Sequence, residues 1–136
     1  MRIIVCPDKF RGTATAAQAA QALAEGISRS QRDDVVTLPL ADGGEGTLDA
    51  LGGSNRVSQV TGPLGDLVSA RWRISGNLAV VEMAEASGLL LAGGPQHNDP
   101  LAASTLGNGE ILVEARTAGA RRIIVGVGGS ASTDGG

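Results

Sequence analysis

Short β-branched runs alternate with helical segments in the first fifty residues, and this alternation most constrains the fold. Strands are expected at 3–6 and 35–40, and helices at 13–30 and 45–51. Thr13 or Thr15 is positioned to cap the first helix, and Gly52-Gly53 ends the second. A β-α-β-α order favours a parallel sheet with helices packed on it.

The pattern changes after residues 52–56, where closely spaced strands replace the alternation. Further strands are expected at 57–61, 68–74, 78–83 and 123–127, with a helix at about 109–118. The tight turns between the first three of these strands favour antiparallel pairing. The sequence therefore predicts an α/β protein with a Rossmann-like parallel-sheet lobe at 1–54. The beginning of a second α/β lobe with a β-meander is expected at 55–136, in an incomplete chain.

The composition narrows the function classes. Phe10 and Trp72 are the only aromatic residues, so the core has to be built from Ala, Val, Ile and Leu. The net charge is −3 and the basic residues are scattered, which argues against a nucleic-acid partner. Cys6, the single cysteine, is expected as a buried thiol in the first strand. Because no apolar stretch is long enough for a signal peptide or a membrane span, the sequence predicts a cytoplasmic protein without a membrane partner.

A glycine-rich loop follows the last predicted strand. Residues 128–136 consist almost entirely of glycine and hydroxyl residues, with one acid, Asp134. Gly128, Gly129 and Ser130 leave backbone N–H groups free to meet an anion and let a phosphate approach closely. The loop predicts phosphate chemistry, and the chain stops inside it.

A second glycine turn, Asp42-Gly43-Gly44-Glu45-Gly46, follows the strand expected at 35–40. Three glycines in four positions cost backbone entropy unless close approach or a positive φ is needed. Asp42 and Glu45 are candidates for holding magnesium, or for taking a proton from a substrate hydroxyl. The alternative is a structural turn in which Glu45 favours the helix dipole.

Further loops carry chemistry-bearing residues. Asp8, Lys9 and Arg11 follow the first strand, where the two cations are able to neutralise a phosphate or carboxylate. A solvated surface loop is the alternative. Gly107, Gly109 and Glu110 mark a helix start, as a ligand site or as a plain helix terminus. Two other acids, Glu82 and Glu85, face a site or solvent, and His97 is expected to be exposed.

The final loop permits a competing interpretation. Gly126 to Ala131 fits G-x-G-x-x-A, a relaxed dinucleotide-binding pattern. The acid that would test it, about twenty residues further on, falls beyond residue 136. No Gly-Lys-Ser/Thr occurs, so the Walker A type of kinase loop is excluded.

Taken together, these segments resemble the bacterial-type (type I) glycerate kinases, and the chain resembles their N-terminal portion. The resemblance follows the whole chain in order and spacing. It is carried by the segments at 7–12, 39–47, 61–65, 82–89, 105–110 and 128–136. Lys9 stands where serine is frequent in the family, and Arg11 where lysine is frequent. Two further departures are Leu106-Gly107-Asn108 in place of Tyr-Gly-Thr, and Ser132-Thr133 in place of Thr-Asn.

The resemblance implies ATP-dependent phosphorylation of D-glycerate, with magnesium, at a site between two lobes. Lys9 and Arg11 would meet glycerate carboxylate or phosphoryl charge, and Asp42 and Glu45 would be metal ligands or the base. The residues expected to line the substrate or nucleotide site are Asp8, Gly43, Gly44, Gly46, Gly107, Gly109, Glu110, Gly128, Gly129, Ser130 and Asp134. Two alternatives stay open: a dinucleotide-dependent oxidoreductase fragment, and a truncated chain without catalysis of its own.

Overall fold

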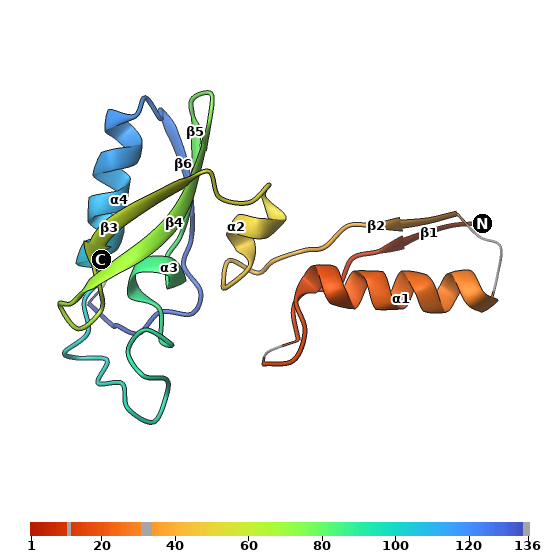
Figure 1. The fold of residues 1–136 in the computed structure, drawn as a ribbon, viewed down its shortest axis with the longest axis horizontal. Coiled ribbons are helices and arrows are strands. Elements are labelled where there is room, and N and C mark those ends of the chain that lie inside the picture. The colour runs from red at the N-terminus through yellow and green to blue at the C-terminus, as the bar shows by residue number, and fades with distance from the viewer. Residues whose placement is uncertain (11, 31–33, 135–136) are drawn as a thin grey trace. The chain divides into compact units, whose positions relative to one another are not determined.

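The computed structural model describes residues 1–10, 12–30 and 34–134 (Figure 1). The chain divides into two compact units, Met1–Asp42 and Gly43–Gly136. The lobe boundary that the sequence predicts, between residues 54 and 55, falls inside the second unit and stays a prediction. In the described part of the chain, no helix is long and apolar enough to cross a membrane.

The first unit is a β-α-β motif. Strand β1 (Arg2–Val5) pairs in parallel with β2 (Asp34–Thr37), and helix α1 (Ala16–Ser30) connects them. The Thr15 hydroxyl accepts a bond from the Gln18 amide at 3.1 Å, while the Gln18 side chain accepts one from the Thr15 amide at 2.9 Å. This reciprocal capping box selects Thr15 over Thr13 as the start of the helix.

Cys6 is exposed, so the prediction of a buried thiol is wrong. Side chains alternate between the faces of a strand. Val5 is buried whereas Ile4 and Cys6 are exposed on either side of it. Helix α1 packs on this small sheet and, among the unit's described residues, the face carrying Ile4 and Cys6 is left open.

The second unit is a four-stranded mixed sheet. Its strands are β3 (Arg56–Thr61), β4 (Leu67–Ser75), β5 (Leu78–Glu82) and β6 (Arg122–Gly126), in that spatial order. The β3-β4-β5 meander is antiparallel, as predicted, and β6 pairs in parallel with β5. Three helices accompany the sheet: α2 (Thr47–Ala50), α3 (Ala84–Ser87) and α4 (Leu106–Thr117).

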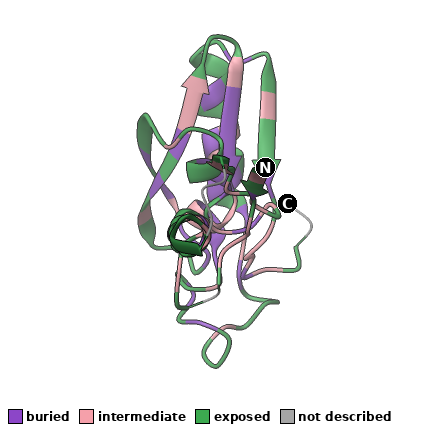
Figure 2. Cartoon of the chain, turned by 90° about the vertical axis from the view of Figure 1, so that its right-hand side faces the viewer, coloured by how far each residue is buried: buried purple, intermediate pink, exposed green. Residues whose placement is uncertain are grey.

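Helix α4 supplies one side of the core. Ile111 and Ala115 on the helix pack with Val60, Trp72 and Val81 of the sheet, and all five are buried. Figure 2 colours the buried stretches of the chain purple. The indole N–H of Trp72 donates to the Ser58 hydroxyl at 2.9 Å, which satisfies its one polar atom. A core with one aromatic residue is therefore closed mainly by aliphatic side chains, as the composition predicts.

Strand β5 is the central element that positions the site. From Ala79 to Glu82 every residue is buried, because α4 lies on the side of Ala79 and Val81 and α2 on the other. Its parallel partner β6 places Gly126 opposite Glu82. The carboxyl ends of the two strands therefore coincide, and in α/β sheets ligands gather at such ends.

Candidate functional site

Two glycine turns meet at the carboxyl ends of β5 and β6. The Gly128 amide donates to the Gly43 carbonyl at 2.8 Å, so the expectation that this N–H is free to meet an anion is wrong. A Cβ on Gly128 would lie 2.6 Å from the Gly44 Cα, and one on Gly126 would lie 2.7 Å from the Gly43 oxygen. Only glycine permits this backbone-to-backbone approach. The structure thus brings together two of the segments that the sequence singled out.

Glu45 lies against the second of these turns. A Cβ added to Gly129 would stand 2.7 Å from Glu45 Oε1, and Gly129 has a φ of +72°. The half-buried Glu45 carboxylate therefore sits on the backbone of the loop that follows β6. This places one acid beside N–H groups of the kind that bind phosphate.

Asp8, Lys9 and Asp42 form a charged cluster in the first unit. The Lys9 ammonium lies 3.2 Å from Asp42 Oδ1 and 4.0 Å from Asp8 Oδ1. Only 16% of the Lys9 side chain is exposed, so its stem is packed while its charge faces two carboxylates. The third expected member, Arg11, lies outside the described residues.

Glu82 is an acid for which the sequence left two positions open, one facing a site and one facing solvent. It is 3% exposed, and its two oxygens accept bonds from the Gly46 amide at 3.1 Å and the Leu48 amide at 2.8 Å. Burial raises the pKa of Glu82 above its usual value, and the Leu48 and Gly46 bonds act against that rise. Its position at the end of an apolar run was the available signal.

The neighbouring acid has a different role. Glu85 accepts bonds from the Arg71 guanidinium, with a shortest distance of 2.6 Å, and Asp49 lies 3.8 Å from the same guanidinium. The bond to Glu85 raises the pKa of Arg71. Glu85 therefore belongs to a partly exposed ion network rather than to the glycine turns.

Asp134 and Glu110 tie the end of the chain and helix α4 to their neighbours. Asp134 Oδ2 accepts bonds from the Thr105 amide and hydroxyl, and its Oδ1 accepts one from Ser132. Glu110 accepts bonds from the Thr61 amide at 2.7 Å and hydroxyl at 3.0 Å. Both acids hold segments in place here, and their expected contacts with a ligand stay predictions.

The loop after β6 turns back instead of opening a helix. Ser130 forms an antiparallel bridge with Gly88, and the Ala131 amide donates to the Ser87 carbonyl. No helix starts among the described residues 127–134. A dinucleotide fingerprint requires a helix that begins within the motif, so the geometry does not favour the oxidoreductase interpretation.

His97 and Asn108 are two further polar residues of the second unit. His97 is exposed, as expected, and its Nδ1 lies 3.2 Å from the Gly93 carbonyl oxygen. Asn108 is 5% exposed; its amide nitrogen donates to Ser87, and its Oδ1 has no partner among the described residues. This acceptor lies in the first turn of α4.

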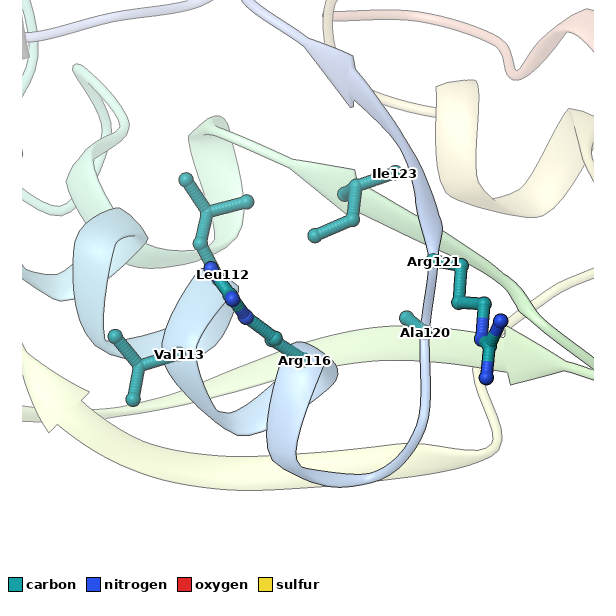
Figure 3. A pocket seen from close by; sticks show the side chains of 6 residues that line it. All are labelled: Leu112, Val113, Arg116, Ala120, Arg121 and Ile123. Carbon is teal, nitrogen blue, oxygen red and sulfur yellow. The ribbon is translucent and has the colours of Figure 1, made fainter.

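A shallow depression of about 590 Å³ lies elsewhere in the second unit (Figure 3). Its lining is Leu112, Val113, Arg116, Ala120, Arg121 and Ile123. These residues come from the second half of α4, the connection after it and the start of β6, whereas the glycine loop follows the other end of β6. The depression is thus separate from the glycine turns.

The arrangement of His, Cys, Asp and Glu side chains limits the kind of metal site that this chain could form by itself. Among the described residues, no three His, Cys, Asp or Glu side chains converge in a way that would hold an ion. Magnesium in phosphoryl-transfer sites is held by one or two carboxylates together with substrate phosphates and water. A site of that kind needs only one or two protein carboxylates, fewer than a three-residue cluster.

The raised pKa of Glu82 predicts a pH-dependent stability. Its folded-state pKa exceeds the unfolded value, so the stabilisation is present below the ordinary pKa of 4.5 and is lost as pH rises through the folded value. Desolvation dominates, and the nearby Glu85 and Asp49 carboxylates act in the same direction. We therefore compare the free energies of unfolding of the parent and of Glu82→Gln. The difference, parent minus variant, should decrease as the pH rises from 4 to 7. Denaturant titrations at each pH measure this difference, and a rise would contradict the prediction.

The mixed sheet and its paired glycine turns define an α/β protein with glycine-rich loops at the carboxyl ends of two parallel strands. The model of the glycerate kinase family matches residues 3–136, and the chain belongs to that family. This confirms the resemblance that the sequence motifs indicated, and it does not favour the dinucleotide interpretation.

Individual relatives agree over the whole chain. It is 46% identical to a glycerate kinase of Halalkalibacterium halodurans over 98% of its length. Over the full 136 residues of this chain, it is 43% identical to the glycerate 2-kinase of Escherichia coli. It also matches the crystal structure of a candidate glycerate kinase 2 from Salmonella typhimurium LT2 with a TM-score of 0.79 and 40% identity, covering 100% of this chain and 38% of that one. The chain spans about 37% of the two curated relatives.

Proposed function

We propose that the protein to which this chain belongs phosphorylates D-glycerate with ATP and magnesium. The observation that carries the proposal is the pair of glycine turns held backbone to backbone, with Glu45 lying against Gly129. Family membership over residues 3–136 supports the same activity. A cytoplasmic location belongs to the proposal as well.

Phosphoryl transfer depends mainly on aligning the attacking hydroxyl with the γ-phosphate and on stabilising the charge of the transition state, rather than on a covalent intermediate with the protein. The hydroxyl oxygen of glycerate forms a bond to the γ-phosphorus while the bond from that phosphorus to the β-phosphate oxygen breaks. ADP leaves, and the hydroxyl proton passes to a carboxylate, Asp42 or Glu45. Lys9, packed beside Asp42, supplies positive charge for a carboxylate or phosphoryl group.

The glycine loops supply N–H donors for phosphate oxygens. Gly129 and Ser130, which follow β6, are the proposed donors, since the Gly128 amide already donates to the Gly43 carbonyl and the Gly46 amide to Glu82. Magnesium, when bound, spreads the charge of the phosphates, and Asp42 and Glu45 are the residues that would hold it. Asp8, Arg11, Gly107, Gly109, Glu110 and Asp134 complete the proposed binding set.

Asp42→Asn should lower glycerate-dependent ADP release at least about 100-fold, within the range of a lost general base. The change keeps the side chain's size but removes its charge and its ability to accept a proton. It also leaves Lys9 with a neutral partner at this position. Coupled ADP-release kinetics on the protein as its gene encodes it, and on the 136-residue chain alone, provide the measurement.

Asp34→Asn is the matched control, since Asp34 makes an exposed 3.9 Å pair with Arg2 in the same unit. Its turnover should match that of the parent. Full activity of Asp42→Asn would remove Asp42 from the mechanism. ADP release without glycerate dependence, or glycerate-dependent reduction of a nicotinamide, would overturn the kinase proposal. Activity confined to a longer protein would assign catalysis to that protein and not to these 136 residues alone.

A further inference from the structure

Both carboxylate oxygens of Glu82 accept hydrogen bonds from one short segment, residues 46–48. Oε1 accepts from the Gly46 amide and Oε2 from the Leu48 amide, so the side chain spans the junction between the glycine turn and α2. The carboxylate comes from β5, thirty-six residues further along the chain than Gly46. It is therefore a long-range anchor for a segment that has little regular structure of its own.

The turn needs such an anchor. Gly43 and Gly46 have φ values of +95° and +94°, and glycine loses more conformational freedom on ordering than any other residue. On the other side of Glu45, the Gly43 carbonyl accepts from Gly128, and the Gly44 carbonyl accepts from the Thr47 hydroxyl at 2.7 Å. Glu45 thus lies between residues fixed to β6's loop and residues fixed by Glu82.

A carboxylate is a costly way to fill this space. Burying its charge is unfavourable unless hydrogen bonds compensate, and an apolar side chain would pack at lower cost. What the carboxylate adds is two directed bonds to the amides of the turn. Its raised pKa is consistent with that cost.

We propose that Glu82 is a positioning residue, which fixes the turn from Gly43 to Gly46 and through it the carboxylate of Glu45. The kinetic part of this inference rests on the proposed kinase function, whereas the structural part does not. Glu82 touches no substrate in this role, because its two oxygens are directed at backbone amides.

The test compares Glu82→Gln and Glu82→Ala with Glu85→Gln in the protein as its gene encodes it. Glutamine keeps the shape but presents an N–H group toward one of the two backbone amides. Amide-resolved hydrogen exchange at Gly46 and Leu48 should become at least about 10-fold faster in the Glu82 variants, with Val81 unchanged, as expected for local opening. Glu85→Gln loses a bond to Arg71 instead and should leave both amides protected.

The same variants are assayed for glycerate-dependent ADP release against magnesium concentration. We expect kcat to fall about 10- to 100-fold in the Glu82 variants, as for misplacement of a catalytic group, with a raised half-saturating magnesium concentration. A purely structural defect would lower the folded fraction and leave that half-saturation unchanged. Unchanged exchange at Gly46 and Leu48, or unchanged half-saturation in a folded Glu82→Gln, would overturn the inference.

Two remaining outcomes are also decisive. If neither Glu82 variant folds, exchange in the unmodified protein decides: Gly46 and Leu48 should be protected like β5, and exchange at the rate of an exposed loop would refute the anchor. If the parent has no kinase activity, the proposed function fails on its own. The exchange data would then still confirm or refute Glu82 as the anchor of the turn.

Discussion

Gly128→Ala should reduce kcat/KM for glycerate phosphorylation at least about 100-fold, the scale associated with an ångström-sized misplacement near a reacting group. The added Cβ would lie 2.6 Å from the Gly44 Cα and 2.8 Å from the Gly44 nitrogen. Both are backbone atoms and cannot swing aside as a side chain would. The two turns therefore have to separate, which strains the bond from the Gly128 amide to the Gly43 carbonyl.

The measurement is coupled ADP release together with a denaturant titration. Overpacking of this kind costs about 1–3 kcal/mol, so the activity loss should exceed the loss of folded protein. Gly26→Ala is the control: Gly26 lies in α1, and its added Cβ meets no atom within 4 Å. Alanine is also the better helix former. Parent-like kcat/KM in Gly128→Ala would show that the contact between the turns does not limit catalysis.

Local periodicity was sufficient to predict most elements of the fold. The capped helix ending at Ser30 and the antiparallel meander over β3 to β5 were both found. Helix α4 begins at Leu106, about three residues before the expected start at 109. Two glycines in its first turn suggested a loop, but Gly107 is there because the helix backbone packs against β3. Tertiary contact overrides local propensity at this position.

The segments that form the candidate site could be picked out from the sequence, but the long-range hydrogen bonds that hold them could not. Glycine turns bearing Asp42 and Glu45 are visible as local patterns, because glycine clustering next to acids is rare without a reason. Glu82 was left undecided, since its partners are separated from it by more than thirty residues. No pattern within a short window distinguishes a buried carboxylate anchored to distant amides from an exposed acid at a strand end.

Asp134 and Glu110 illustrate the same limit. Their carboxylates receive hydrogen bonds from Thr105 and Thr61, twenty-nine and forty-nine residues away. The sequence left Glu110 undecided between a ligand site and a plain helix terminus, and it placed Asp134 in a loop expected to line the substrate or nucleotide site. The structure adds that each one holds a loop against helix α4 or against the end of β3, and this is compatible with a ligand role for neighbouring backbone groups.

Gly107→Ala should destabilise the second unit by about 3 kcal/mol, at the upper end for an overpacked contact. The new Cβ would lie 2.1 Å from the Thr61 carbonyl oxygen and 3.2 Å from a Val60 methyl group. Helix α4 would have to move away from β3, which also weakens the bonds from Thr61 to Glu110. Denaturant unfolding of the protein as its gene encodes it measures the free-energy change.

Gly109→Ala provides the matched control two residues further along the same helix. Its Cβ meets no atom within 4 Å, so alanine should stabilise the helix by up to about 1 kcal/mol through its higher propensity. The two variants thus have opposite expected signs for the same chemical change. Equal effects would mean that α4 does not pack on β3 as closely as the Gly107 contact requires. A large loss for Gly107→Ala alone would establish that this glycine is required by the approach of the helix to the strand, independently of any role in binding.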